Sequence, residues 1–331
     1  MGCDCVNYLP PGIKLEDVAE FLSILGYPLG NFATFEGMPI YGCNFYKDED
    51  YKYFTGVEVL AYLKDGTIHV ETRTSIWRTK WDSDFHNFTV KQLQKRFGGT
   101  FISDFGKSRF LRYDGQVRIA AEAGCYFAFF HLSNDFSSAH SYLEFLKEAK
   151  NHVKTPSFPK QLLEAVHRTD PIIISTNLFL PFLVSVLEEY FKSTYIALLR
   201  YSPRKSTVIK SARIPAEELT SVSNEEQSME EAITKSMSFQ NIGKVCTYFK
   251  ELDSKLDLYG TLKKPYKRRR ESMFDTFDRI LHQRHEFIHR SKMNPNYTIE
   301  MAFKDLETVR AAVTRVYKYL ISTYKWQPWP M

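Results

Sequence analysis

Long apolar runs and cysteines are scarce in this 331-residue sequence. No run approaches about 18 consecutive apolar residues, so we expect no membrane-spanning helix. The segment MGCDCVNYLPPG lacks the charged and apolar regions of a secretion signal. The five cysteines are few, odd in number and irregularly spaced, which argues against a disulfide framework and predicts a reducing, cytoplasmic environment.

A strong excess of charge of one sign is also missing. The sequence has 44 Lys and Arg against 39 Asp and Glu, a net charge of +5. This mild positive excess permits an RNA partner without requiring one. Apolar residues make up 44% and charged residues 25%, as in ordinary soluble proteins. The length suggests about two domains, at roughly 150 residues each.

No strong catalytic pattern occurs in the first half of the chain. The tripeptide GKS at 106–108 resembles the end of a phosphate-binding loop, but that loop requires a glycine where Phe101 stands. The pattern is broken, and a phosphate-binding loop is therefore excluded.

Two short groups in the first half contain residues that can bind metals. Asp82, Asp84 and His86 are one such group, although a solvated loop leading into a helix explains them more simply. Cys3 and Cys5 are the other, and they would need two further ligands nearby. The simpler interpretation is a pair of reduced thiols on a terminal segment.

Turn and helix signals in the first half are clear. Asp65-Gly66 separates two runs rich in β-branched and aromatic residues, which predicts a β-hairpin across 53–77. Apolar residues at helical spacing, followed by glycines, predict helices at 15–26 and 89–99.

Further apolar runs predict strands at 100–105 and 108–114, and a buried strand at 123–132. Asn134 or Ser137 is expected to cap a helix after that strand. We therefore expect residues 1–150 to form one small α+β domain of sensor or regulatory type.

The second half has helical periodicity instead. A polar segment with two prolines, residues 151–160, predicts the join between domains. Apolar residues then recur at helical spacing in 180–200, 271–292 and 299–326. We expect residues 160–328 to form an all-α helical bundle.

A basic segment, KKPYKRRR, leads into the helix expected at 271–292. Its cations could hold RNA phosphates, with Tyr266 stacking on a base. The alternative is a solvated loop between helices. The basic residues are Lys263, Lys264, Lys267, Arg268, Arg269 and Arg270.

The hexapeptide RHEFIH, residues 284–289, has two interpretations. HEFIH fits the pattern of zinc proteases, in which His285 and His289 would bind the metal and Glu286 would activate a water. Such a site needs a third protein ligand. The tripeptide RSK follows directly, and no recognisable third-ligand motif comes after it. A zinc hydrolase is therefore the weaker interpretation.

The second interpretation pairs Arg284 with His289, about 140° apart around a helix. The long Arg side chain can still converge with His289 on one phosphate, most easily when a partner chain completes the site. VLEEYFKSTY, SMSFQNIGKVCTYFKELD, RHEFIHR and the long closing helix together resemble the HEPN superfamily, in particular the RiboL-PSP-type proteins of bacterial defence and toxin systems. The resemblance covers about residues 165–326, and the family motif matches at Arg284, His285 and His289.

The resemblance implies a HEPN bundle that acts as a metal-independent endoribonuclease, without a cofactor, in toxin or abortive-infection antiviral defence. His289 would be the general acid or base, Arg284 would hold the phosphate and His285 would orient one of them. The product would carry a 2′,3′-cyclic phosphate. The family also implies a homodimer through the helical domain.

The role of the first domain and an alternative function of the helical domain follow from the same resemblance. The first domain would offer a place for a phage-derived or antitoxin regulator, since an unregulated ribonuclease harms its own cell. The alternative function is a non-catalytic HEPN module for RNA binding or dimerisation.

Overall fold

The protein consists of two compact units, residues 1–123 and 124–331. The first contains an antiparallel sheet with helices, and the second is mostly helical, as the sequence predicts. The computed structural model describes residues 2–46, 50–115, 119–152, 170–265 and 271–327.

The first unit is built on a seven-stranded antiparallel sheet with the order β2-β3-β4-β5-β1-β6-β7. β1 lies inside this sheet, because Val6 is opposite Glu71 of β5 on one side and Ile102 of β6 on the other. Cys3 and Cys5 therefore belong to an interior strand that the sequence did not reveal. The strands are β1 (Gly2–Tyr8), β2 (Asn31–Phe35), β3 (Met38–Phe45), β4 (Val57–Lys64), β5 (Thr67–Ser75), β6 (Thr100–Ser103) and β7 (Gly106–Lys107).

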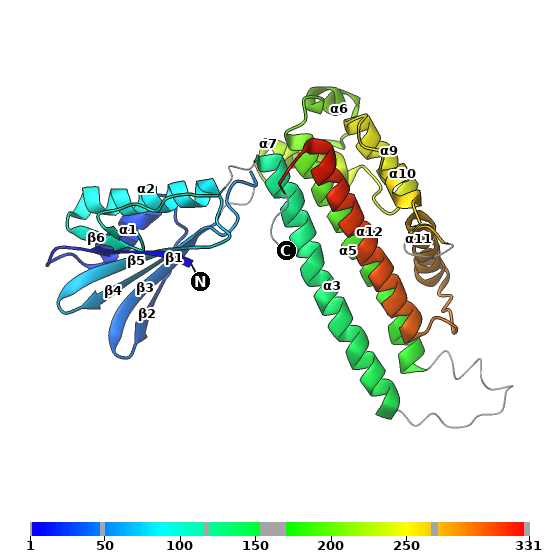
Figure 1. The fold of residues 1–331 in the computed structure, drawn as a ribbon, viewed down its shortest axis with the longest axis horizontal. Coiled ribbons are helices and arrows are strands. Elements are labelled where there is room, and N and C mark those ends of the chain that lie inside the picture. Colours follow the sequence, from blue (N-terminus) through cyan, green and yellow to red (C-terminus); the bar gives the residue numbers. More distant parts are fainter. Residues whose placement is uncertain (1, 47–49, 116–118, 153–169, 266–270, 328–331) are drawn as a thin grey trace. The chain divides into compact units, whose positions relative to one another are not determined.

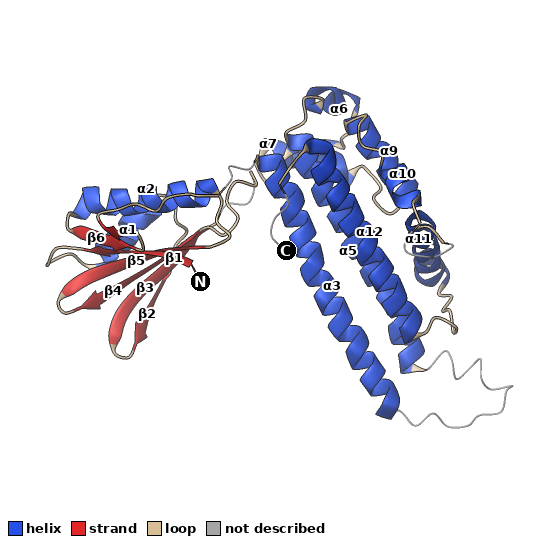
Figure 2. Ribbon diagram, viewed as in Figure 1, coloured by secondary structure: helices blue, strands red, loops and turns tan. Residues whose placement is uncertain are grey.

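Two helices, α1 (Leu15–Ile24) and α2 (Lys80–Phe97), cover one face of this sheet (Figure 2). Val18 and Leu22 of α1 share a hydrophobic core with residues of β4 and β5 such as Val59 and Val70. Strand residues alternate between buried and more exposed along β4 and β5, as expected for a sheet with one face in the core.

The predicted hairpin is confirmed at β4 and β5. Asp65 and Gly66 form its two-residue turn with φ values of 50° and 75°, the left-handed conformations that such a turn requires. A second hairpin of the same kind joins β2 to β3 through Glu36 and Gly37, with φ values of 50° and 78°. This second hairpin was not expected from the sequence.

Two predicted strands are wrong. Residues 108–114 are not a strand, and 123–132 belong to the 33-residue helix α3 (Ala120–His152). A short apolar run fits a buried strand or a buried helix equally well. The helix is favoured here because buried residues continue at spacings of three and four, namely Leu132, Phe136, Ala139, Leu143 and Leu146.

The helix α3 explains why the first unit ends at residue 123 and not near residue 150, as expected from the sequence. Phe129 of α3 stacks on Tyr317 with ring centroids 4.4 Å apart, so this helix packs within the second unit. The expected join at 151–160 falls largely on residues 153–160, which lie outside the described residues.

Three long helices, α3, α5 (Pro171–Arg200) and α12 (Ile299–Tyr324), run along one another in the second unit (Figure 1). Tyr142 of α3 stacks near Phe179 of α5, with ring centroids 6.5 Å apart. The motif helix, α11 (Met273–Arg290), packs on α5 and α12. The shorter helices are α6 (Lys205–Ser211), α7 (Ala216–Ser223), α8 (Met229–Lys235), α9 (Ile242–Leu252) and α10 (Leu258–Lys263).

Among the described residues, α5 is the one helix that is long and apolar enough to cross a membrane. In its most apolar window 44% of the residues are buried inside the protein, and a core helix of a soluble bundle has the same length and composition. The absence of a membrane span therefore stays a prediction.

Candidate functional site

The motif helix α11 has a well-defined start and an amphipathic body. The hydroxyl of Ser272 accepts a hydrogen bond from the backbone N–H of Asp275 at 3.1 Å, which caps the first turn. Met273, Thr276, Phe277 and Ile280 are buried on one face. The opposite face is left for polar residues, and this is where the motif histidines lie.

The middle of α11 is tied to α12 by an ion pair. Arg279 donates from Nη1 to Oδ2 of Asp305 at 3.1 Å and from Nη2 to Oδ1, and the hydroxyl of Tyr297 donates to Oδ2 at 3.2 Å. Asp305 is only 3% exposed. Its carboxylate raises the pKa of the Arg279 guanidinium above the ordinary value. Two parallel bonds of this kind fix orientation as well as distance.

The chain that follows α11 is held by a buried asparagine of α5. Asn177 accepts a hydrogen bond from the backbone N–H of Asn294 at 2.8 Å and donates to the carbonyl of Asn294 at 3.1 Å. Asn177 is 1% exposed. Together with Ser291, whose left-handed φ of 49° ends the helix, this clamp fixes the position of the last turn of α11.

His285 and His289 lie side by side on the exposed face of that last turn. Their ring centroids are 4.6 Å apart and the rings are tilted by 45°, as expected for residues one helical turn apart. Both residues are exposed. Both imidazoles are therefore accessible to a substrate bound at this turn.

Arg284 is half-buried and follows Phe277 and Ile280 at helical spacing, so it lies on the packed side of α11 rather than on the face of the two histidines. Its Nε atom is buried and has no hydrogen-bond partner among the residues that the structure describes. A buried, unpaired donor on a guanidinium costs free energy unless something binds it. The Nε atom of Arg284 is therefore a donor that no described residue satisfies.

Glu286 forms ion pairs on the same turn. Its carboxylate lies 2.9 Å from Nη1 of Arg290 and 3.9 Å from Nζ of Lys292, and its side chain is 17% exposed. In a zinc hydrolase this carboxylate would have to act on a metal-bound water. Here two cations compete for it.

The histidine pair also lacks a third ligand within the described part of the chain. No group of three or more His, Cys, Asp or Glu residues comes close enough there to hold a metal ion. A catalytic zinc site requires three protein ligands. The residues near His285 and His289 therefore do not fit such a site.

The basic segment is described only at its start. Nζ of Lys263 lies 2.6 Å from Asp275 and 4.8 Å from the ring centroid of Phe274, so this lysine is already paired. Lys264 is exposed, and its carbonyl accepts a hydrogen bond from Arg315 at 2.7 Å. The remaining members lie outside the described residues, namely Lys267, Arg268, Arg269 and Arg270.

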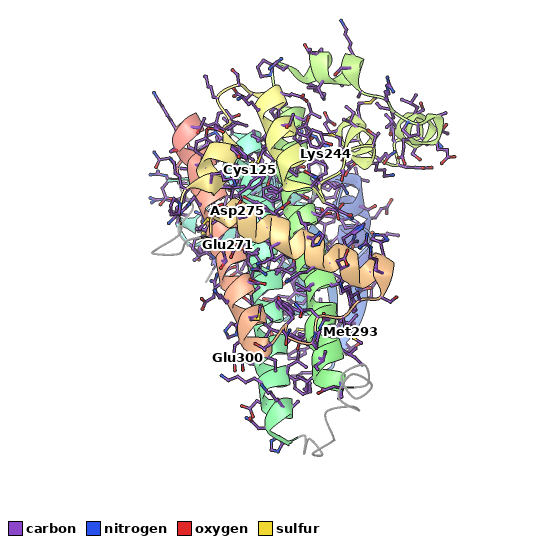
Figure 3. The ribbon with its side chains drawn as sticks, turned by 90° about the vertical axis from the view of Figure 1, so that its right-hand side faces the viewer. Cys125, Lys244, Glu271, Asp275, Met293 and Glu300 are labelled. Atoms are coloured by element: carbon purple, nitrogen blue, oxygen red, sulfur yellow. The ribbon has the colours of Figure 1, made fainter. Side chains whose placement is uncertain are left out.

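The start of the basic segment and the motif lie at opposite ends of α11. Figure 3 shows Glu271 and Asp275 at one end of this helix and Met293 beyond the other. The 14 residues from Asp275 to His289 correspond to about 21 Å of helix. Lys263, held at Asp275, cannot reach a phosphate that contacts His289.

The candidate metal ligands of the first unit have structural roles. Asp82 is fully buried in the first turn of α2 and accepts backbone N–H bonds from Phe54 at 3.1 Å, Gly56 at 3.0 Å and Thr79 at 2.7 Å. Burial still raises the pKa of Asp82. The helix start is confirmed, but the solvated loop is wrong, because Asp82 joins two chain segments inside the protein.

His86 is fully buried one turn further along α2. Its Nε2 atom lies 3.0 Å from the carbonyl oxygen of Thr72 and therefore donates to it. Burial lowers the pKa of His86 below its ordinary value. A buried, neutral histidine that bonds to β5 is a packing residue of the first unit.

The sequence predicts Arg284, His285 and His289 as site residues but does not indicate the residues that hold their helix in place. Asn177 and Asp305 are far from the motif in sequence, and neither belongs to a local pattern. Comparisons of the chain with protein-family models, with curated proteins and with solved structures found no match.

Proposed function

We propose that the chain is a metal-independent endoribonuclease whose helical unit is a HEPN domain, with Arg284, His285 and His289 as its site. The observation that carries the proposal is the pair of exposed imidazoles, 4.6 Å apart, at the anchored end of α11. Arg284, the arginine of the motif, is half-buried next to His285 in the chain and has one donor that no described residue satisfies.

The reaction needs proton transfer and charge stabilisation, and these residues supply both. The RNA 2′-oxygen attacks the adjacent phosphorus and the bond to the 5′-oxygen breaks, which leaves a 2′,3′-cyclic phosphate and a 5′-hydroxyl. His289 removes the 2′-hydroxyl proton or protonates the leaving oxygen. His285 orients the His289 side chain. Arg284 offsets the negative charge that develops on the phosphate.

Substitution of each group tests the proposal. Arg284→Ala and His289→Ala are each expected to lower the rate of RNA cleavage by about 10²–10⁴, the usual loss for one acid–base group. His282 is a matched control, because it is another exposed histidine on α11 outside the motif. His282→Ala should cut RNA normally. The assay is gel cleavage of total cellular RNA, with circular dichroism to confirm folding.

The same assay separates the enzyme from a binding module. If both motif variants cleave RNA at the wild-type rate, or if the wild type does not cleave at all, the nuclease proposal is wrong. RNA binding that survives without cleavage would then favour the non-catalytic HEPN module. Mapping the ends of the cleaved RNA would also identify its substrate and the expected cyclic phosphate.

The remaining parts of the proposal concern partners. RNA is the substrate, a second copy of the helical unit completes the site, and the first unit regulates it, with a phage-derived or antitoxin molecule as its ligand. A cytoplasmic location without membrane attachment fits an RNA substrate. The cysteines are sparse and irregularly spaced, which is consistent with that location.

A further inference from the structure

The two edges of the sheet in the first unit are protected very differently. At one edge β7 has only two residues, Gly106 and Lys107, and ends the sheet with a charge. At the other edge β2 has five residues, NFATF, all exposed and none charged. Natural edge strands are normally blunted by charge, proline, a bulge or a short length. β2 contains no charged residue, no proline and no bulge.

The position of Pro39 determines which backbone groups of β2 are free. Pro39 lies opposite Thr34 and has no N–H, so these two residues form a pair without hydrogen bonds. Bonded and non-bonded pairs alternate along an antiparallel ladder, so Asn31, Ala33 and Phe35 bond to β3. The N–H and C=O groups of Phe32 and Thr34 therefore point outward from the sheet.

These outward groups are complementary to those of a second β2. In an antiparallel pair centred on Ala33, Phe32 of each copy faces Thr34 of the other, and both pairs exchange two hydrogen bonds. Ala33 then meets Ala33 of the second copy on the symmetry axis, where the backbones approach most closely and a small side chain fits. Phe35 faces Asn31 in the same register.

The exposed aromatic rings favour the same association. Phe32 and Phe35 are 57% and 60% exposed, and a strand added at this edge would cover part of both. We propose that β2 is a self-association edge, at which two copies of the chain join their sheets through an isologous β2–β2 pair. A second copy fits because the strand is uncharged and its outward backbone groups, at Phe32 and Thr34, are placed symmetrically about Ala33.

A disulfide across the symmetry axis tests this register. Ala33→Cys in the full-length chain places two thiols at a non-bonded antiparallel pair, where Cβ atoms come close enough for a disulfide. We expect a covalent dimer on a non-reducing gel after mild oxidation. The wild type, with its own five cysteines, and Thr34→Cys should remain largely monomeric, because Thr34 faces Phe32 rather than itself.

Proline at position 34 provides the second arm. The N–H of Thr34 points outward and takes no part in the β2–β3 ladder, so Thr34→Pro should leave the hairpin folded. It removes one of the backbone N–H groups that would bond to a second β2. Added to Ala33→Cys, it should abolish the covalent dimer. Equal cross-linking of Ala33→Cys and Thr34→Cys, or cross-linking that survives Thr34→Pro, would overturn the proposal. The result is independent of RNA cleavage.

Discussion

At the residue scale, Glu286 separates the two interpretations of the motif. Glu286→Gln keeps the size of the side chain and removes its ion pairs with Arg290 and Lys292. Arg290 is 66% exposed, so the loss costs only about 0–1 kcal/mol and the fold should persist. RNA cleavage is expected to be nearly unchanged, measured by gel assay with His289→Ala as the inactive reference. A loss as large as that of His289→Ala would instead indicate that Glu286 is the base of a hydrolase.

His86 gives the first unit a specific pH dependence. Burial lowers the pKa of His86 below 6.5 in the folded state. The unfolded chain therefore binds a proton at His86 more readily than the folded chain does. Its contribution to stability is therefore present above pH 6.5 and lost as the pH falls through the folded-state pKa. His86→Gln retains a donor for Thr72 but has no such proton.

The measurement is urea unfolding of the wild type and His86→Gln on either side of pH 6.5. The wild type should lose stability relative to the variant on the acidic side. A difference between the two proteins that does not change with pH would show that His86 does not titrate in this way.

At the scale of elements, the clamp between α5 and the end of α11 should control how well the motif is positioned. Asn177→Ala leaves the N–H of Asn294 without its partner, while the carbonyl of Asn294 still accepts a hydrogen bond from the N–H of Tyr297. An unpaired donor costs about 1–3 kcal/mol where water cannot replace the partner. We expect faster amide hydrogen exchange across the last turn of α11 and a lower cleavage rate with little change in RNA affinity. Asn134→Ala, an exposed position on α3, is the matched control. If Asn177→Ala and Asn134→Ala changed hydrogen exchange and the cleavage rate equally, Asn177 would not be a positioning residue.

The elements that sequence reasoning predicted correctly have local causes. Asp65-Gly66 indicates a hairpin because the turn itself requires left-handed backbone at both residues, and α11 follows from its cap and its apolar face. The run at 123–132 was misread because its burial is decided by α5 and α12, which a local window does not contain. β1 was missed because its inward positions include Asn7, a polar residue that is buried and bonded to the carbonyl of Val90 at 3.2 Å.

In the candidate site, too, the sequence predicts what depends on local spacing and not what depends on distant contacts. The spacing of Arg284, His285 and His289 places them correctly on one helix end, since one helix turn is a local property. Asn177 contacts a residue 117 positions away, and Arg279 pairs with a residue 26 positions away. Such pairs leave no trace in a single sequence, because either partner alone is an ordinary polar residue.

At the scale of the whole molecule, the proposed site depends on two chains. If Arg284 of one copy acts with His289 of another, a mixture of Arg284→Ala and His289→Ala should regain activity after subunit exchange, because each mixed dimer has one intact combination. With random exchange, about a quarter of the wild-type sites are restored, since half of the dimers are mixed and each has one intact site of two. Single-turnover RNA cleavage measures that fraction. A mixture as inactive as its components would place the whole site within one chain.

The separation of Lys263, at the described start of the basic segment, from the motif has a consequence for the length of a substrate. Asp275, which binds Lys263, and His289 are about 21 Å apart along α11, which corresponds to about six phosphates of a stacked single strand at about 3.4 Å each. A dinucleotide at the histidines would be out of reach of Lys264. Only longer transcripts would bridge both ends of the helix, and a ribonuclease of the proposed kind would then favour them through tethering rather than through recognition of particular bases.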